Sequence, residues 1–498
     1  AATCVLRLLS QQTKEVMDYM AKKKKINNIN WKGTIGVYVL GFIVLSALAI
    51  LPNLSQISIV RVITQLATTA VLLISLALYV YFSDRECMER ISKSVAMFTT
   101  MVLSYLAVQL ACLWKWGIYV VPFALCTLVL SLIVSVKVGF FANFVIIMLC
   151  FNQFVNWQND ATLASEQVFY LLFGGVTEAV FASYILGKHY RRSRYLGVGV
   201  LLGIVSAVSE TISYMMFLDD LSQWSWQDIG VKFGCAAASG MVGVMLMFVL
   251  VPLFERVFNV VSVFRFSEIA SSDTPLMRKL YEKAPGTYNH SLSVAIYVEA
   301  CATAIGESAV EARACAYYHD IGKMRNPQYF SENQFSGVNP HDNMTPEASV
   351  NIIKAHTVNG LALAKEYGLP KEVQDAIMQH HGTMPLKYFY LKAKKYTDGD
   401  LPYDGYCYDG PKPTSKIAAM LMICDASEAA LRAHGDRTNA EKIVDGIVAE
   451  RLAFDQFSNC DITMKEIDII KSTIITTFSG IRHKRVKYPE IVLEGENK

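Results

Sequence analysis

The chain has 498 residues, enough for about two to four domains. Hydrophobic residues make up 53% of it and charged residues only 18%, a balance that is unusual for a water-soluble protein. The formal net charge is only +3, so no overall basic character points to long nucleic acid as a partner. The 11 cysteines are scattered without a Cys-x-x-Cys pair, which argues against a disulfide framework, a zinc ribbon or an iron–sulfur site.

Residues 1–33 are a basic N-terminal segment that we expect to lie in the cytoplasm. Four consecutive lysines, Lys22 to Lys25, stand shortly before the first apolar stretch. Met20 and Ala21 directly precede these lysines and resemble a natural start. We therefore interpret the residues before Met20 as an upstream extension.

The apolar excess lies almost wholly before residue 258. Eight stretches there are each about long enough to cross a hydrocarbon core roughly 30 Å thick. They run roughly over residues 34–51, 60–82, 95–114, 117–136, 138–155, 168–187, 195–218 and 230–253. Residues 34–253 are therefore predicted to form a transmembrane helix bundle of about eight spans in a lipid bilayer.

The charges of the loops predict the orientation of this bundle. Basic residues follow the second, fourth, sixth and eighth spans: Arg85, Arg90, Lys93, Lys137, Lys188, Arg191, Arg192, Arg194, Arg256 and Arg265. The intervening loops at 156–167 and 219–229 contain no lysine or arginine. The positive-inside rule therefore predicts a multi-pass protein of the plasma membrane with both termini in the cytoplasm.

Two glutamates, Glu178 and Glu210, fall inside the sixth and seventh predicted spans. A buried carboxylate in a membrane is costly unless it is protonated or paired. One interpretation is a ligand or proton site within the bundle. The other, which the sequence alone favours, is a pair of neutral acids that hydrogen-bond between helices beside Thr177, Ser206 and Ser209.

The rest of the chain is predicted to be helical, with a juxtamembrane linker at 254–275 and a charged tail at 481–498. Asp273 or Thr274 is suited to cap the next helix, with Pro275 at its first position. Apolar residues recur at steps of three and four, which predicts helices at 290–305, 308–323, 346–367, 371–381, 414–433 and 439–453. The predicted fold class is all-α: a polytopic transmembrane helix bundle followed by an all-helical cytosolic domain at 276–480.

Histidines concentrate in this cytosolic part, where six of the chain's nine fall between His290 and His381. A lone histidine in a helix is usually a packing or surface residue, but a cluster of imidazoles and carboxylates indicates a metal site. Asp425 lies within an apolar run, where an unpaired carboxylate is costly. The candidate ligands are His290, His319, Asp320, His356, His380, His381 and Asp425.

This set of ligands also indicates the kind of metal and of chemistry. Seven groups are too many for one tetrahedral site and suit two divalent metal ions with one bridging carboxylate. Imidazole and carboxylate ligands without thiolate favour iron or manganese over structural zinc. Two neighbouring ions activate water and clamp a phosphoryl oxygen, so the pattern favours hydrolysis of a phosphoester.

Several longer strings carry a family resemblance. They are Ala284 to Ser291, Tyr317 to Lys323, Glu332 to Gln334, Asn339 to Asp342, His380 to Thr383 and Gly410 to Pro413. The chain resembles the seven-transmembrane HD-domain proteins, bacterial membrane cyclic-di-AMP phosphodiesterases of the PgpH type, from about residue 251 to 490. Members usually carry a large extracytoplasmic domain after their first span, whereas only about eight residues, Pro52 to Ile59, stand there in this chain.

The resemblance implies an HD-domain phosphohydrolase that cuts cyclic-di-AMP to the linear dinucleotide 5′-pApA. It implies one metal ion on His290, His319, Asp320 and Asp425, and a second on Asp320, His356, His380 and His381. Asp320 is then the bridge, and His319, Asp320 and Lys323 are the expected catalytic residues. Lys323 follows Asp320 by three residues and is expected to neutralise phosphate charge if the helix continues.

Contacts to the substrate are expected from Lys323, Tyr288, Asn333 and His341. Tyr288, Tyr329 and Phe330 are candidates for stacking on adenine, although simple core packing explains any one of them equally well. His341 is expected mainly to support the substrate loop. A homodimer is plausible for a membrane signalling protein, but no residue pattern predicts one.

Two other functions stay open. The same chemistry suits another nucleotide, such as cyclic-di-GMP or (p)ppGpp, although the Gly-Tyr-Pro string typical of cyclic-di-GMP hydrolases is absent after Gly382. A membrane receptor whose HD domain only binds nucleotide is the alternative from another class. The complete set of ligands argues against it, because a domain that only binds need not keep all seven.

Overall fold

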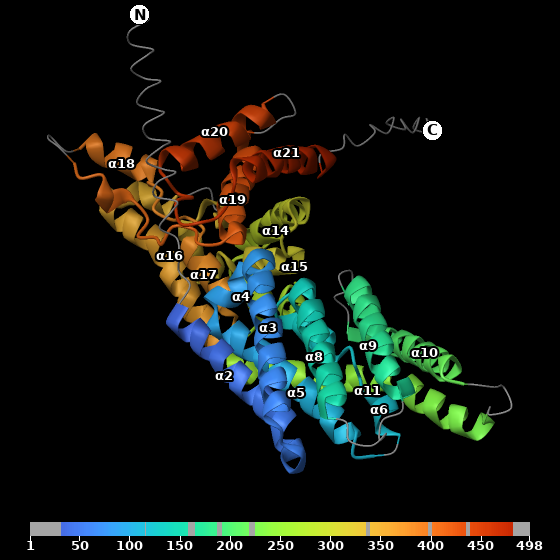
Figure 1. The fold of residues 1–498 in the computed structure, drawn as a ribbon. Coiled ribbons are helices and arrows are strands. Elements are labelled where there is room, and N and C mark those ends of the chain that lie inside the picture. The colour runs from blue at the N-terminus through green and yellow to red at the C-terminus, as the bar shows by residue number, and fades with distance from the viewer. Residues whose placement is uncertain are drawn as a thin grey trace, which may run out of the picture. The chain divides into compact units, whose positions relative to one another are not determined.

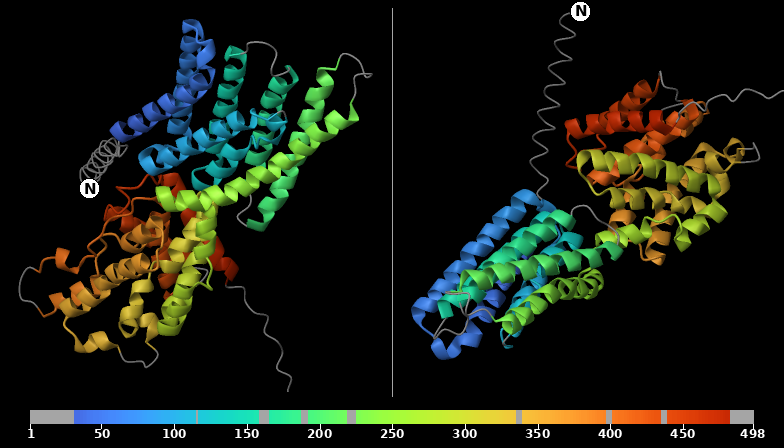
Figure 2. Two further views of the ribbon diagram at one scale, coloured as in Figure 1. Left: turned by 90° about the horizontal axis from the view of Figure 1, so that it is seen from below. Right: turned by 90° about the vertical axis from the view of Figure 1, so that its right-hand side faces the viewer.

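The computed structural model describes residues 31–114, 116–157, 165–186, 192–218, 225–334, 339–396, 401–434 and 439–481. Within these ranges every regular element is a helix, apart from one isolated bridge between Pro385 and Cys407. Two further views show the same helical make-up in both parts of the chain (Figures 1 and 2). The all-α fold class is therefore confirmed. The N-terminal segment before Trp31 and almost all of the charged tail lie outside the described residues.

The described chain divides into two compact units. One unit ends at Arg265, and the other contains Phe266 and the residues that follow. Among the described residues, the first unit holds seven helices long and apolar enough to cross a membrane. They are α2 (Trp31–Ile50), α3 (Ile59–Ser83), α5 (Ile91–Ala111), α8 (Val136–Trp157), α9 (Ser165–Leu186), α10 (Arg192–Met216) and α11 (Trp226–Phe258).

The fourth predicted span, 117–136, is not one helix. It consists of α6 (Gly117–Val120) and α7 (Leu125–Ile133), separated by an extended stretch at Val121 and Pro122. Proline lacks a backbone N–H and clashes with the preceding helical turn, so it interrupts the helix here. The expectation of a continuous span was therefore wrong at this point.

The broken segment nevertheless carries the chain back across the bundle. The amide of Gln109 near the end of α5 donates to Gln153 near the end of α8, 2.5 Å away, and Tyr105 also bonds to Gln153. The C-terminal ends of α5 and α8 therefore lie side by side. The chain leaves α5 at one end of the bundle and enters α8 at the other, so α6 and α7 make the return crossing.

The second unit is built from helices. They are α13 (Pro275–Lys283), α14 (Pro285–Ile305), α15 (Ala309–Tyr318), α16 (Pro346–Glu366), α17 (Lys371–Gln379), α18 (Lys387–Lys394), α19 (Lys416–His434), α20 (Ala440–Ala453) and α21 (Met464–Ile481). Six of them, α14 to α17, α19 and α20, correspond to the ranges predicted from the sequence. Thr274 caps α13 by accepting from the Met277 amide at 3.3 Å, with Pro275 in the first turn, as predicted. Two boundaries differ by about five residues: α14 begins at Pro285 and not near residue 290, and α15 ends at Tyr318 and not near residue 323.

A tight turn replaces the expected end of α15. The 3-10 helix η3 (Ile321–Arg325) packs against α16, and Gly322 lies at the contact. A Cβ at Gly322 would lie 1.8 Å from the His356 carbonyl oxygen, closer than any real contact. Glycine thus lets the turn after Asp320 approach the helix that carries His356, which sets the spacing of the site.

Candidate metal centre

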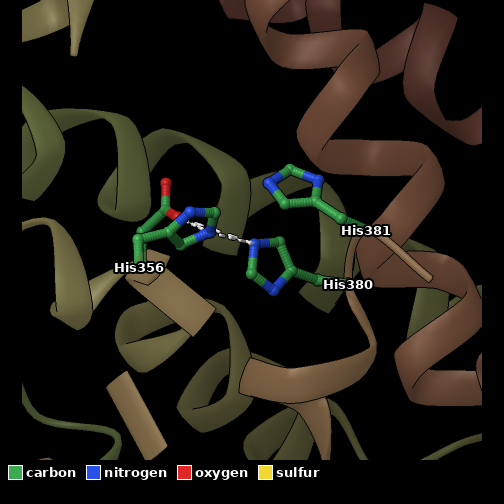
Figure 3. A group of neighbouring side chains, drawn as sticks. His356, His380 and His381 are labelled. Carbon is green, nitrogen blue, oxygen red and sulfur yellow. Dashed lines mark hydrogen bonds and ion pairs between the residues drawn. The ribbon is translucent and has the colours of Figure 1, made fainter. Parts of the chain in front are cut away.

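Seven side chains from five parts of the second unit converge at one place. His290 comes from α14, His356 from α16 and Asp425 from α19. His319 and Asp320 follow the last turn of α15, and His380 and His381 follow α17. Figure 3 shows the rings of His356, His380 and His381 pointing toward one another. All seven sequence-predicted ligands are thus brought together, and all are buried except the partly exposed His381 and Asp425.

The seven residues form two groups. His290, His319 and Asp425 offer ligand atoms within 4.8 Å of one another, and so do Asp320, His356, His380 and His381. In the first group His290 Nε2 lies 2.9 Å and His319 Nε2 3.6 Å from Asp425 Oδ1. In the second group His356 Nε2 lies 3.3 Å from His380 Nε2.

The carboxylate of Asp320 lies between the two groups and presents one oxygen to each. Its Oδ2 is 3.2 Å from His319 Nε2 and 3.8 Å from His290 Nε2. Its Oδ1 is 3.4 Å from His356 Nε2 and 3.6 Å from His380 Nε2. A carboxylate shared in this way has the arrangement of a bridge between two cations.

Four of the histidines are oriented by a hydrogen bond at the ring nitrogen that faces away from the cluster. His319, His356 and His380 each place Nδ1 against the backbone oxygen three residues earlier, at 2.8, 2.6 and 2.8 Å. His290 Nδ1 instead bonds Glu428 Oε2 at 2.6 Å. A carbonyl oxygen can only accept, so Nδ1 carries a proton in His319, His356 and His380, and Nε2 is the nitrogen that faces the cluster.

The donor spacing fits metal ligation. Ligands about 2.1 Å from one ion lie roughly 3.0 to 3.4 Å apart in octahedral or tetrahedral geometry. The shortest spacing in the second group, 3.3 Å, falls in that range. His319 Nε2 and Asp320 Oδ1 are buried and have no hydrogen-bond partner among the described residues. Buried polar atoms of this kind are costly, and a divalent cation would satisfy both.

In the absence of an ion, the carboxylates and the burial of the cluster shift the pKa values of its histidines in opposite directions. Burial lowers the pKa of His319, but Asp320 and Asp425 outweigh it and raise that pKa to about 10. Burial lowers the pKa of His356 to about 3, with help from its neighbour His380. Without an ion, His319 therefore holds an extra proton between the carboxylates of Asp320 and Asp425. His356 stays neutral, with the lone pair of Nε2 available to a ligand.

Lys323 is held against the bridge. Its Nζ lies 2.6 Å from Asp320 Oδ2 and 2.8 Å from Glu332 Oε1, and 5.0 Å from the centre of the Phe330 ring. The α-helix does not continue to Lys323 as expected. A 3-10 turn has about three residues per turn, so it still places residues three apart on the same side. Lys323 reaches Asp320 for this reason.

Two of the residues expected to contact the substrate, Asn333 and Tyr288, instead contact neighbouring parts of the protein. Asn333 is buried and caps α14, its Oδ1 accepting from the Gly286 and Thr287 amides at 2.9 and 3.2 Å. Tyr288 packs edge-on against Tyr281 of α13, with ring centres 5.2 Å apart. These two side chains are therefore engaged in packing and capping, a role that the sequence did not separate from substrate binding.

His341 also has a structural role. It is buried, its Nε2 lies 2.9 Å from the Tyr329 carbonyl oxygen, and its ring packs edge-on against Phe389. It fastens the segment around Tyr329 to α18, and its expected support of a substrate loop stays a prediction. Phe330 is buried edge-on to His356, with ring centres 5.8 Å apart.

Three residues at the site were not anticipated. Glu428, which orients His290, lies three residues after Asp425 in α19, and that spacing on one helix face was a usable signal. Tyr408 stacks on His381 with ring centres 4.3 Å apart, but nothing local in the sequence indicates it. Gln456 accepts from the Thr383 amide at 2.9 Å and so fixes the turn after His381.

Comparison with known proteins agrees with this arrangement. Residues 59–262 match the family model described as a 7TM receptor with intracellular HD hydrolase, and residues 287–430 match the HD domain. The chain belongs to the seven-transmembrane HD-domain family. It is a multi-pass membrane protein, and its HD domain contains the cluster described above from His290 to Asp425.

Several members of the family are similar over much of the chain. Cyclic-di-AMP phosphodiesterase PgpH of Listeria monocytogenes is 38% identical over 374 residues, which are 75% of this chain and 50% of that protein. PgpH of Bacillus subtilis is 37% identical over 75% of this chain and 51% of its own length. The chain thus spans about half the length of the curated relatives it matches.

Solved structures of the same domain are also similar. The L. monocytogenes PgpH HD domain is 46% identical and is matched over 42% of this chain and 100% of its own, with a TM-score of 0.41. The same domain has been solved in complex with cyclic-di-AMP, with the same identity and TM-score and 99% of its length matched.

Proposed function

We propose that this protein is a membrane-anchored, metal-dependent phosphodiesterase that hydrolyses cyclic-di-AMP to 5′-pApA in the cytoplasm. The observation that carries the proposal is the Asp320 carboxylate, which presents Oδ1 to His356 and Oδ2 to His319. Such a buried bridge between two sets of imidazoles suits a pair of divalent ions. The names of the curated relatives supply the substrate.

Two ions are proposed, with iron or manganese favoured because the donors are imidazole and carboxylate without thiolate. When bound, such ions supply Lewis-acid stabilisation of a phosphoryl oxygen and an activated water. The ligands proposed for them are His290, His319, Asp320 and Asp425 on one side and Asp320, His356, His380 and His381 on the other. The fold is proposed to hold these donor atoms in place before the ions bind.

Lys323 is proposed to serve both the bridge and the substrate. Its ammonium is shared between Asp320 and Glu332 and is therefore fixed in position. A fixed cation beside the reacting phosphodiester would offset the negative charge that develops on its oxygens. Because Glu332 shares the ammonium of Lys323 with Asp320, it fixes the position of that ammonium. Glu332 is therefore proposed as a positioning residue.

The proposed stacking platform for adenine is the ring of Tyr408, which lies beside the proposed metal ligand His381. Tyr408 lies against the partly exposed His381, with an angle of 26° between the rings. A base has an aromatic face of its own and stacks readily on such a platform. This assigns to Tyr408 the role that the sequence suggested for Tyr288.

The proposed orientation places the HD domain in the cytoplasm. The end of α11 and the start of α8 and α10 carry Arg256, Lys137 and Arg192. The start of α9 and the start of α11 carry the acids Glu166 and Asp228 instead. Because α6 and α7 complete the crossing, these two sets fall on opposite sides, and the basic side is assigned to the cytoplasm of a bacterial plasma membrane.

The test is hydrolysis of cyclic-di-AMP by the full chain in detergent or nanodiscs, loaded with Mn²⁺ or Fe²⁺ under reducing conditions. We expect 5′-pApA, no comparable turnover of cyclic-di-GMP, and loss of activity in Asp320→Ala. A folded, metal-loaded protein that hydrolyses neither dinucleotide would overturn the proposal. Tight nucleotide binding without turnover would then identify a receptor.

A further inference from the structure

The membrane unit contains a line of buried polar groups that the proposed hydrolysis does not use. We call it the polar column. It consists of Glu166, Lys232, Tyr119, Tyr170, Glu210, Ser206 and Glu178, contributed by α6, α9, α10 and α11. Polar groups inside a membrane bundle are costly, so a set of this size calls for a function.

The outer end of the column is an ion pair near the start of α9 and of α11. Lys232 is only 6% exposed and lies 2.7 and 3.0 Å from the two carboxylate oxygens of Glu166. Its ammonium also lies 4.4 Å from the centre of the Tyr214 ring, and Tyr119 donates to Glu166 at 2.9 Å. The ammonium of Lys232 is thereby satisfied by Glu166 and two aromatic rings.

Tyr170 links this ion pair to deeper groups. Its ring lies 5.4 Å from that of Tyr119, and its hydroxyl is 2.6 Å from Ser206 Oγ. Both Glu178 and Glu210 interact electrostatically with Tyr170. Glu178 lies roughly 18 Å further along α9 than Glu166, since a helix rises about 1.5 Å per residue. The column thus extends from the acidic end of the bundle well into its interior.

The two deep carboxylates have oxygens without a hydrogen-bond partner among the described residues. Glu210 is fully buried, and neither of its oxygens has a hydrogen-bond partner among the described residues. Glu178 is 1% exposed; its Oε2 accepts from the Ala124 amide at 3.3 Å, but its Oε1 has no partner in the described part of the chain. The ammonium of Lys232 is already paired with Glu166 and also lies 3.7 Å from Asp228.

The break between α6 and α7 contributes to this geometry. A continuous helix would bond the Ala124 amide internally, but after Pro122 that amide is free to hold Glu178. Interrupted helices in membrane proteins commonly surround ion and substrate sites, because their unpaired backbone groups line a cavity. The interruption thus accounts for one oxygen of Glu178, and it leaves Glu210 as the carboxylate of the column with both oxygens unpaired among the described residues.

We propose that the polar column binds a small cation at the unpaired carboxylate of Glu210, reached from the acidic end of the bundle. A monovalent metal ion and a primary ammonium share the required chemistry, namely one positive charge and a small radius. This replaces the interpretation of two neutral, hydrogen-bonded acids, since the structure gives Glu210 no hydrogen-bond partner among the described residues. The site does not depend on the activity of the HD domain.

The test uses the full chain in lipid nanodiscs and measures its melting temperature. NaCl, KCl or methylammonium chloride is titrated at constant ionic strength against N-methyl-D-glucamine chloride, a cation too large for the site. We expect a saturable rise of about 2–4 °C with at least one small cation. A response to Na⁺ or K⁺ identifies an inorganic ion, and a response to methylammonium alone identifies an amine.

Two variants locate the effect. Glu210→Gln keeps the side-chain shape and removes the charge, so it is expected to abolish the rise, whereas Glu210→Asp keeps the charge and is expected to retain part of the rise. Glu89→Gln, which changes a carboxylate in the short helix α4 (Arg85–Glu89), is the matched control and is expected to keep the rise. No saturable rise in the unmodified chain, an equal rise in Glu210→Gln, or a dependence on pH alone would overturn the proposal.

Discussion

Glu428 bonds His290 through Oε2 and Nδ1, 2.6 Å apart, and thereby turns His290 Nε2 toward Asp425. The other three oriented histidines use backbone carbonyls, which mutation cannot remove. His290 is thus the one whose orientation depends on a replaceable side chain. A carboxylate in this position also makes the imidazole a stronger ligand.

We expect Glu428→Gln to weaken metal binding by about 10- to 100-fold at the first group, because it removes this oriented, charge-assisted bond. Binding is measured by competition with a fluorescent chelator on metal-stripped protein. Glu441→Gln in α20 changes a surface carboxylate away from the cluster and serves as the control. Unchanged affinity in Glu428→Gln would show that His290 is oriented by packing alone.

Asp320→Asn tests the bridge. The amide keeps the shape but loses one anionic oxygen, so we expect both metal stoichiometry and turnover to fall, turnover by roughly 100-fold or more. Metal content is measured by mass spectrometry of the purified protein, and helicity by circular dichroism. Retention of one full equivalent of metal with normal turnover would contradict the shared role of Asp320.

Metal binding is expected to release protons. In metal-free protein the pKa of His319 is raised to about 10, so at neutral pH its imidazole is protonated and must lose a proton to bind. Affinity is therefore expected to rise by about tenfold per pH unit between pH 6.5 and 8.5 for each proton released. Calorimetry in two buffers of different ionisation enthalpy counts the protons, and a value of zero would refute the assignment.

The raised pKa of His319 also predicts how the stability of the metal-free protein changes with pH. The pKa of His319 is raised in the folded state, so its stabilising contribution is complete below the unfolded value of about 6.5. That contribution is lost as the pH rises through about 10. Chemical unfolding of metal-stripped protein is expected to show falling stability from pH 7 to 10, whereas His319→Gln is expected to show a weaker dependence.

Gly322→Ala tests the close contact that spaces the site. Its Cβ would lie 1.8 Å from the His356 carbonyl oxygen, so η3 must move away from α16. We expect a loss of about 3 kcal/mol or more of stability, together with weaker metal binding at the second group. Gly446→Ala in α20 is the control, since its Cβ meets no atom within 4 Å. In a helix interior that change is expected to stabilise by about 0.5–1 kcal/mol.

The sequence by itself determined the features that depend on local pattern. Long apolar runs gave the membrane spans, the three- and four-residue periodicity gave the helices of the second unit, and Thr274 with Pro275 gave a helix start. Hydrophobic burial and capping act over a few residues, so they can be recognised without a fold. The concentration of histidines indicated a metal site because residue type alone shows which side chains can bind a metal.

Only the tertiary structure decided how distant groups meet. The sequence could not show that Asp320 Oδ1 and Oδ2 face different histidines, that Asn333 caps α14, or that Tyr408 lies on His381. Nor could it show that the oxygens of Glu210 have no hydrogen-bond partner in the described part of the chain, while Glu178 accepts from the Ala124 amide that follows Pro122. Most of these relationships join residues tens of positions apart, and their distances are set by helix packing, which no short sequence pattern encodes.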